Sequence, residues 1–130
     1  MKRSKLRKTP KPKSNSWYRK KCVERAKIEA KERDKYICQR CGKDGNNGYK
    51  IDGSHVFPEG HYHGMSAMAE NIKAMCFQCH KWWHSNPIDA HNWFKAKFPE
   101  RYKTLKALSL KTIQINWRQE YEQPQSGLKK

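Results

Sequence analysis

Two Cys-x-x-Cys pairs carry the most specific chemistry in this chain of 130 residues. Cys38 with Cys41 and Cys76 with Cys79 can each deliver two thiolates to one ion, and four thiolates satisfy the tetrahedral coordination of a structural Zn²⁺. Disulfide bonds are the alternative use of the same residues. The odd fifth cysteine, Cys22, and the metal-type spacing favour zinc and a reducing compartment over an oxidised framework.

Two histidines follow the second cysteine pair. His80 and His84 are four residues apart, so on a helix their imidazoles point to the same side and can share a second metal ion. A zinc ion that already has four thiolates does not need them. The alternative is that one of these histidines replaces or supports a cysteine at the structural zinc. The spacing favours the second ion.

The charge of the chain favours a polyanionic partner. The sequence holds 29 Lys and Arg against 12 Asp and Glu, a formal net charge of +17. Nucleic acid is the expected partner, because cationic side chains displace the counterions of phosphates. With 35% apolar residues the chain can bury only a small core, so we expect one domain that depends on its metal. The sequence suggests no secretory signal or membrane span, and we expect an intracellular protein without a membrane partner.

Much of the positive charge lies near the N-terminus. Residues 1–14 contain basic side chains and prolines but no acid, which predicts a disordered basic arm. Ser14 and the two residues after it offer N-caps for a helix over about 17–35, whose apolar stripe is thin. The residues expected to contact DNA are Lys2, Arg3, Lys5, Arg7, Lys8, Lys11 and Lys13 in the arm, and Arg19, Lys20 and Lys21 in the helix.

The elements that must position the cysteines and histidines are short. Together they predict an α+β fold in one domain over 15–122, with its core at about 36–85. The predicted elements, in chain order, are a strand over 49–56, an antiparallel strand over about 70–75, a helix over 79–85, a helix from Pro87, a helix over 102–121 and a polar tail over 123–130.

Four sequence features, in their order along the chain, resemble the motifs of the HNH endonucleases. They are the first cysteine pair, the Gly-Ser-His sequence that ends at His55, Asn71, and the Cys-x-x-Cys-His-x-x-x-His sequence that ends at His84. The resemblance covers about residues 36–85. It implies a ββα-metal core with one catalytic divalent cation, often beside a four-cysteine zinc. The wider layout is similar to phage recombination nucleases of the NinG type, which usually have Asn where this chain has His80.

These residues suit the chemistry of phosphodiester hydrolysis. His55 is the expected base, because an imidazole with a pKa of about 6.5 is largely neutral at cellular pH. Asn71, on the neighbouring strand, is expected to hydrogen-bond one ring nitrogen of His55 and so orient it, as the middle Asn of the family does. His80 and His84 would bind the catalytic cation, and phosphate and water would fill its open positions.

One position departs from the family pattern. The residue before the base is commonly Asp or His and binds the metal, whereas this chain has Ser54. Either two histidines bind the ion, or Asp52, His61 or His63 compensates. We favour two histidines, because the side chain of Asp52 should leave the strand face opposite to His55. Such a site should prefer Mn²⁺, Ni²⁺, Co²⁺ or Zn²⁺ to Mg²⁺.

Two functions follow from these residues. The first is a metal-dependent DNA endonuclease, which would lie in the host cytoplasm if a phage encodes it. One active site per chain would nick DNA, and cutting both strands would need a homodimer or two visits. The second is a non-catalytic zinc module that binds nucleic acid. The presence of all four candidate catalytic residues favours the nuclease.

Overall fold

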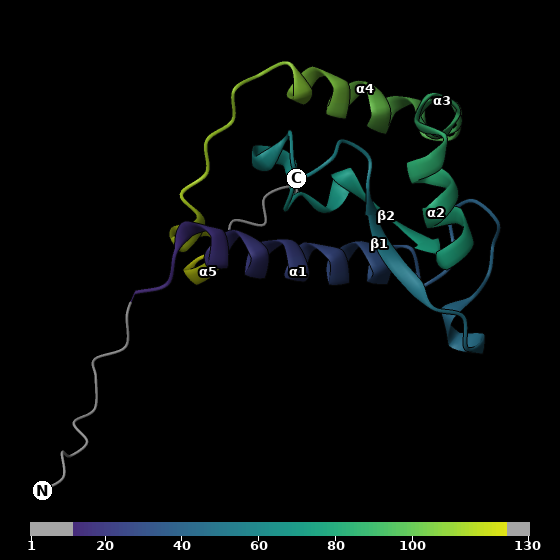
Figure 1. The fold of residues 1–130 in the computed structure, drawn as a ribbon, viewed down its shortest axis with the longest axis horizontal. Helices are drawn as coiled ribbons and strands as arrows, with labels where there is room; N and C mark the ends of the chain where they lie inside the picture. The colour runs from purple at the N-terminus through teal and green to yellow at the C-terminus, as the bar shows by residue number, and fades with distance from the viewer. Residues whose placement is uncertain (1–11, 125–130) are drawn as a thin grey trace, which may run out of the picture.

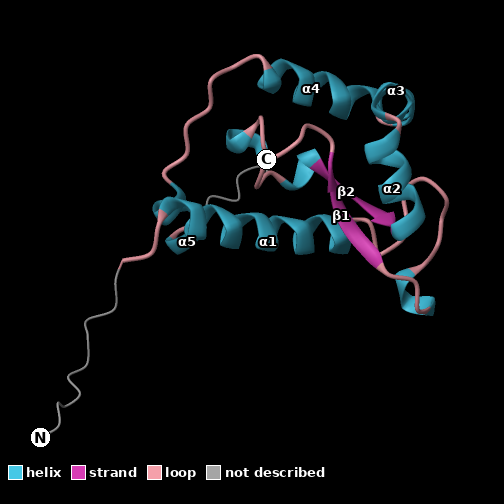
Figure 2. Cartoon of the chain, viewed as in Figure 1, coloured by secondary structure: helices cyan, strands magenta, loops and turns pink. Residues whose placement is uncertain are grey.

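The computed structural model describes residues 12–124. Its class is α+β, as predicted, with a two-stranded antiparallel sheet that lies between helices (Figures 1 and 2). Its helices and strands are α1 (Asn15–Arg33), β1 (Ile51–His55), β2 (Ile72–Cys76), α2 (Phe77–Ser85), α3 (Pro87–Lys97), α4 (Pro99–Ser109) and α5 (Trp117–Glu122), with 3-10 turns η1 (Gly45–Asn47), η2 (His63–Met65) and η3 (Ala69–Asn71).

Helix α1 is held against the sheet by small side chains. It begins two residues earlier than predicted, at Asn15. The candidate cap Ser14 is confirmed, because its hydroxyl accepts a hydrogen bond from the backbone N–H of Trp17 at 3.1 Å. Ala26 and Ala30 are buried and pack against Ile72 at the start of β2. Alanine lets the helix axis approach the strands closely, so a helix with a thin apolar stripe still buries one side.

The two strands lead directly into α2. They pair antiparallel, with Ile51 opposite Cys76 and His55 opposite Ile72. The chain reverses through residues 56–71, which contain η2 and η3. Cys76 ends β2 and is also the N-cap of α2, where its Sγ accepts a hydrogen bond from the N–H of Cys79. The strand–strand–helix order is therefore the predicted one, although β2 begins two residues later than expected.

Helices α2, α3 and α4 build the larger hydrophobic core on the other side of the sheet (Figure 1). Pro87 and Pro99 each occupy the first turn of a helix, where the missing N–H has no intrahelical partner to lose. Trp83, Phe94 and Leu105, one from each helix, are buried in this core. The prolines therefore turn the chain without weakening the helices that cover the sheet.

The predicted helix over 102–121 is wrong in its middle. Helix α4 ends and α5 begins on either side of residues 110–116, which are not helical. The branched side chains of Ile113 and Ile115 disfavour a helix there. Ile113 also packs so closely on Gly64 that a Cβ atom at that glycine would clash with it. Contact with the loop before β2 therefore overrides the local helical pattern.

Helix α5 closes the fold onto the first helix. The Tyr121 ring lies 5.4 Å from that of Trp17 and 5.6 Å from that of Tyr18, centroid to centroid. Arg25 on α1 donates to the backbone carbonyl of Glu120 at 3.1 Å. Figure 1 shows this return of the chain to the N-terminal end of α1. Across residues 12–124, no helix combines the length and the apolar character needed to cross a bilayer.

Candidate metal and catalytic site

The four paired cysteines converge on one point. Their Sγ atoms lie within 4.8 Å of one another, and Cys41 Sγ is 3.6 Å from Cys76 Sγ. Four sulfurs at about 2.3 Å from a tetrahedral ion would be about 3.8 Å apart. The cluster could therefore hold one metal ion, and the predicted convergence of the two pairs is confirmed. Within residues 12–124, it is the only group of three or more His, Cys, Asp or Glu side chains whose ligand atoms lie close enough to hold one metal ion.

A tight turn presents the first cysteine pair. Lys35 and Tyr36 adopt positive φ values of 58° and 56°, which bends the chain sharply after α1. Gly42, with φ of 84°, then closes the cysteine loop, and its N–H donates to the carbonyl of Cys38 at 2.9 Å. The second pair needs no separate loop, because the junction of β2 and α2 carries it.

The electrostatics of the cluster favour a bound cation. Burial raises the pKa of the Cys79 thiol to about 12. Burial also raises the pKa of Cys38, but hydrogen bonds from backbone N–H groups, that of Cys41 first, outweigh it and lower the pKa to about 7. Four thiolates this close repel one another, so they ionise together only around a positive charge. Arg40 supplies part of that charge, because its Nη1 lies 3.5 Å from Cys79 Sγ.

Helix α2 presents the two histidines side by side. His80 Nε2 lies 3.1 Å from His84 Nε2. Two nitrogens at about 2.1 Å from one ion are about 3.0 Å apart when they bind at a right angle. The pair therefore suits two adjacent positions of a metal, as the spacing predicts. His84 is exposed, so the remaining positions of such an ion would face solvent.

The other ring nitrogen of His80 faces a carboxylate. Asp52 Oδ2 lies 3.2 Å from His80 Nδ1. Asp52 leaves the strand face opposite to His55, as expected, and the contact with His80 Nδ1 was not predicted. That face is the one covered by α2. A carboxylate on Nδ1–H fixes the tautomer that leaves Nε2 available to a metal, so Asp52 would position His80 if the pair held an ion.

His55 lies at the end of β1, on the side of α1. Its Nε2 is 2.8 Å from the carbonyl oxygen of Ser66, so in the neutral ring Nε2–H donates there and Nδ1 carries the lone pair. Nδ1 lies 4.0 Å from Glu59, whose carboxylate also pairs with Arg19 at 3.1 Å. Burial lowers the pKa of His55 below the ordinary 6.5, although the Ser66 hydrogen bond and Glu59 act against it. The His55 ring is therefore mostly neutral at pH 7.

Asn71 does not orient His55 directly, and that expected hydrogen bond is wrong. Its fully buried side chain accepts from the N–H of Phe57 at 2.8 Å. It donates to the carbonyls of Phe57 and Met65 at 2.9 and 3.1 Å. Asn71 thus fixes the loop between the strands, and Ser66, next to Met65, carries the carbonyl that holds His55.

Ser54 is buried with a lysine. Lys73 Nζ donates to Ser54 Oγ at 2.8 Å and to the carbonyl oxygens of Ser54 and His55 at 3.2 and 3.3 Å. Burial lowers the pKa of Lys73 well below 10.5. The Ser54 hydroxyl is therefore engaged by an amine. Burial is the main cause of the lowered pKa of His84, and the neighbouring His80 and then Lys73 lower it further.

The residues predicted to contact DNA differ in their surroundings. Arg19 is half-buried in its ion pair with Glu59, and Lys21 lies 3.6 Å from Glu24. Lys20 is exposed, and the exposed Lys13 ammonium lies 5.1 Å from the ring centroid of Trp17. The candidates outside the described residues are Lys2, Arg3, Lys5, Arg7, Lys8 and Lys11.

Several residues around the site were not assigned from the sequence. Glu59 is the acid four residues after His55, and that spacing is its only signal in the sequence. Ser66 acts through its backbone, which no residue pattern reveals, and Lys73 reads as an ordinary charged strand residue. His61 and His63, considered as further ligands, are exposed on the loop before β2, whereas Asp52 is the side chain that reaches His80.

The chain was compared with known proteins. It matches no protein-family model, and no curated protein or solved structure matches it significantly.

Proposed function

We propose that this protein is a metal-dependent DNA endonuclease of the HNH type. The observation that carries the proposal is the pair of Nε2 atoms, 3.1 Å apart on α2, beside a strand that ends in a neutral histidine. A base and a site for a divalent cation are the two components that metal-assisted hydrolysis of a phosphodiester requires. Nicking of supercoiled plasmid in Mn²⁺, with EDTA as the control, tests it.

His55 is proposed to activate water. Its Nδ1 takes a proton from a water molecule, while Nε2–H stays on the Ser66 carbonyl and holds the ring in place. The oxygen of that water attacks the phosphorus, and the bond to the leaving sugar oxygen breaks. Glu59, 4.0 Å from Nδ1, stabilises the imidazolium that forms.

Two metal ions are part of the proposal. Zn²⁺ in the cysteine cluster stabilises the fold, since four thiolates suit this ion, and reduced cysteines imply a reducing compartment. A divalent cation on His80 and His84 would supply Lewis-acid stabilisation of charge on the phosphate. Mn²⁺, Ni²⁺, Co²⁺ and Zn²⁺ suit imidazole ligands better than Mg²⁺ does. One chain carries one such site, so a monomer nicks, and cutting both strands requires a homodimer or two visits.

Ser54 supports a second candidate, a non-catalytic zinc module that binds nucleic acid. Its hydroxyl is held by Lys73, so the position before the base contributes no ligand. A module of this kind would bind DNA through its positive charge and would not nick plasmid under any metal condition.

The first prediction concerns Asp52. Asp52→Asn should weaken metal binding by about 10- to 100-fold, because it removes the carboxylate that fixes the His80 tautomer. The Mn²⁺ concentration that gives half-maximal nicking should rise accordingly, and excess Mn²⁺ should restore the rate. Asp89→Asn, which alters an exposed carboxylate on α3, is the matched control. The same Mn²⁺ midpoint for Asp52→Asn and wild type would contradict the assigned role.

The second prediction concerns the basic arm. Deleting residues 1–11 removes six Lys or Arg but keeps Ser14, the N-cap of α1. Each lost phosphate contact should make the negative slope of log affinity against log salt concentration shallower by roughly 0.9. The loss of affinity should be the same for all DNA sequences. Salt titrations of binding to a duplex measure this slope. Equal slopes for the full and shortened chains would mean that the arm does not contact DNA.

A further inference from the structure

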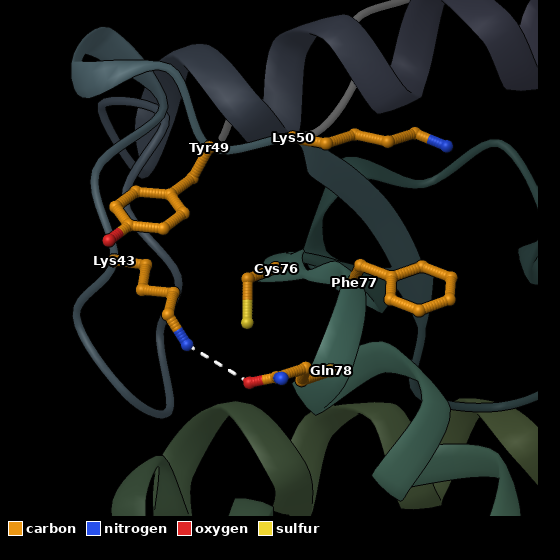
Figure 3. Close-up of a pocket in the computed structure, with 6 residues that line it drawn as sticks. All are labelled: Lys43, Tyr49, Lys50, Cys76, Phe77 and Gln78. Carbon is orange, nitrogen blue, oxygen red and sulfur yellow. Dashed lines mark hydrogen bonds between the residues drawn. The ribbon is translucent and has the colours of Figure 1, made fainter.

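A small pocket lies beside the cysteine cluster, separate from the proposed base and metal pair. Its volume is about 230 Å³, and Figure 3 shows the side chains around it. The size is below the roughly 300–1,000 Å³ of pockets for drug-sized ligands. Its lining comes from the loop before β1 and from the start of α2: Lys43, Tyr49, Lys50, Cys76, Phe77 and Gln78.

Two aromatic rings of the pocket are open to solvent. Phe77 is 59% exposed and Tyr49 is 50% exposed. In Figure 3 the two rings lie on opposite sides of Cys76. Phe77 is the first residue of α2, after the N-cap, and neither ring belongs to the buried core. Folding therefore gains little from an aromatic residue at either position, whereas exposed rings can stack on planar ligands.

The polar groups of the pocket suit a nucleotide. Lys43 and Lys50 bring two positive charges, and none of its lining residues is acidic. Lys43 Nζ lies 5.7 Å from the Tyr49 ring centroid and donates to Gln78 Oε1 at 3.1 Å. Gln78 keeps an amide NH₂ for the edge of a base. Aromatic rings next to lysines are the combination with which proteins bind the bases and phosphates of single strands.

The pocket is connected to the metal pair through two contacts. Lys50 Nζ lies 3.8 Å from Asp52 Oδ1, and Asp52 Oδ2 lies 3.2 Å from His80 Nδ1. The Lys50 side chain is 75% exposed, so this ion pair is weak and leaves the ammonium open to a phosphate. A DNA strand bound at the histidine pair could therefore continue into the pocket.

We propose that this pocket binds an unpaired segment of a DNA strand, with bases stacked on Phe77 and Tyr49 and phosphates on Lys43 and Lys50. The inference builds on the proposed function and extends it to a substrate class: DNA with unpaired nucleotides next to the phosphate that is cut. A fully paired duplex keeps its bases stacked inside the helix, so it can use the lysines but not the two rings.

The test is binding by the full-length protein without added divalent cation, so that no cleavage is needed. Fluorescence anisotropy compares a labelled oligothymidylate with a hairpin duplex that has the same number of phosphates. Phe77→Ala should weaken single-strand binding by about 5- to 150-fold and leave duplex binding nearly unchanged. Phe77→Trp should retain the single-strand affinity. Leu110→Ala, which removes a side chain that is 77% exposed at the end of α4, is the matched control.

The outcomes separate this inference from the nuclease proposal. If Phe77→Ala and Tyr49→Ala keep the wild-type ratio of single-strand to duplex affinity, with zinc content unchanged, the pocket proposal is overturned whether or not the protein nicks plasmid. If the wild-type protein fails to nick plasmid while Phe77→Ala loses single-strand affinity, the pocket stands as a binding site. Loss of a protein dimer in Phe77→Ala, with DNA binding unchanged, would assign the rings to a second copy and also overturn the proposal.

Discussion

Cys38→Ser is expected to unfold the domain. Structural zinc contributes on the order of 10 kcal/mol or more to the folding of small zinc domains, and a serine hydroxyl does not replace a thiolate ligand. The whole stability of a small protein is only about 5 to 15 kcal/mol. The cysteine cluster connects the loop after α1 to the junction of β2 and α2, so losing a bound ion would release that loop from the junction. Circular dichroism melting, together with zinc quantification, measures the effect.

The chain provides a matched control for this substitution. Cys22 is also buried, at 1% exposure, but it lies on α1 outside the cluster, where its thiol donates to the carbonyl of Trp117. Cys22→Ser should keep its zinc and a cooperative melt close to that of wild type. A Cys38→Ser protein that also kept its zinc and its melting curve would contradict the structural role of the cluster.

His55→Ala should slow nicking by about 10²- to 10⁴-fold, the usual contribution of a positioned general base. The side chain contacts the Ser66 carbonyl and Glu59 and, within residues 12–124, is hydrogen-bonded to none of the proposed metal ligands, so metal content, the fold and DNA affinity should be nearly unchanged. Excess Mn²⁺ should not restore the rate, in contrast to Asp52→Asn. The measurement is the initial nicking rate at saturating Mn²⁺. His61→Ala, which alters an exposed loop histidine, is the control and should keep the wild-type rate.

The pH dependence gives a second test of the same role. The base works only in its neutral form, and burial lowers the pKa of His55 below 6.5. The rate should therefore fall on the acid side along a limb centred below pH 6.5, provided that Mn²⁺ stays saturating. A wild-type rate in His55→Ala, or a rate limb centred well above pH 6.5, would exclude this residue as the base.

The parts of the fold that depend on local sequence could be predicted. Ser14 caps α1 because its hydroxyl accepts a hydrogen bond from a nearby backbone N–H. The cysteine cluster could be predicted because each short loop presents two thiols that suit the same metal ion. The predicted bounds of the two strands and of α2 differ from the observed bounds by at most two residues. The i,i+4 spacing of His80 and His84 likewise sets the distance between their rings once they lie on a helix.

The parts of the fold and the site that depend on contacts between residues far apart in the sequence could not be predicted. Residues 110–116 leave the helical path because Ile113 packs on Gly64. The position of Asp52 in the site depends on which face of β1 the helix α2 covers, and alternation along the strand does not reveal that. Asn71 has the expected place beside β2, but its amide is satisfied by the backbone of the loop. Lys73 is buried only because Trp83 and the carbonyls of β1 surround its amine.

Nicking of supercoiled plasmid tests the central claim most directly. Wild-type protein and His84→Ala, purified in parallel, are incubated with plasmid over a series of Mn²⁺ concentrations and in EDTA. The proposal predicts nicked circles from wild type in Mn²⁺, none in EDTA, and a higher Mn²⁺ requirement for His84→Ala, because one of the two Nε2 ligands is lost. No nicking by wild type at any Mn²⁺ concentration, or equal nicking by His84→Ala at low Mn²⁺, would contradict it.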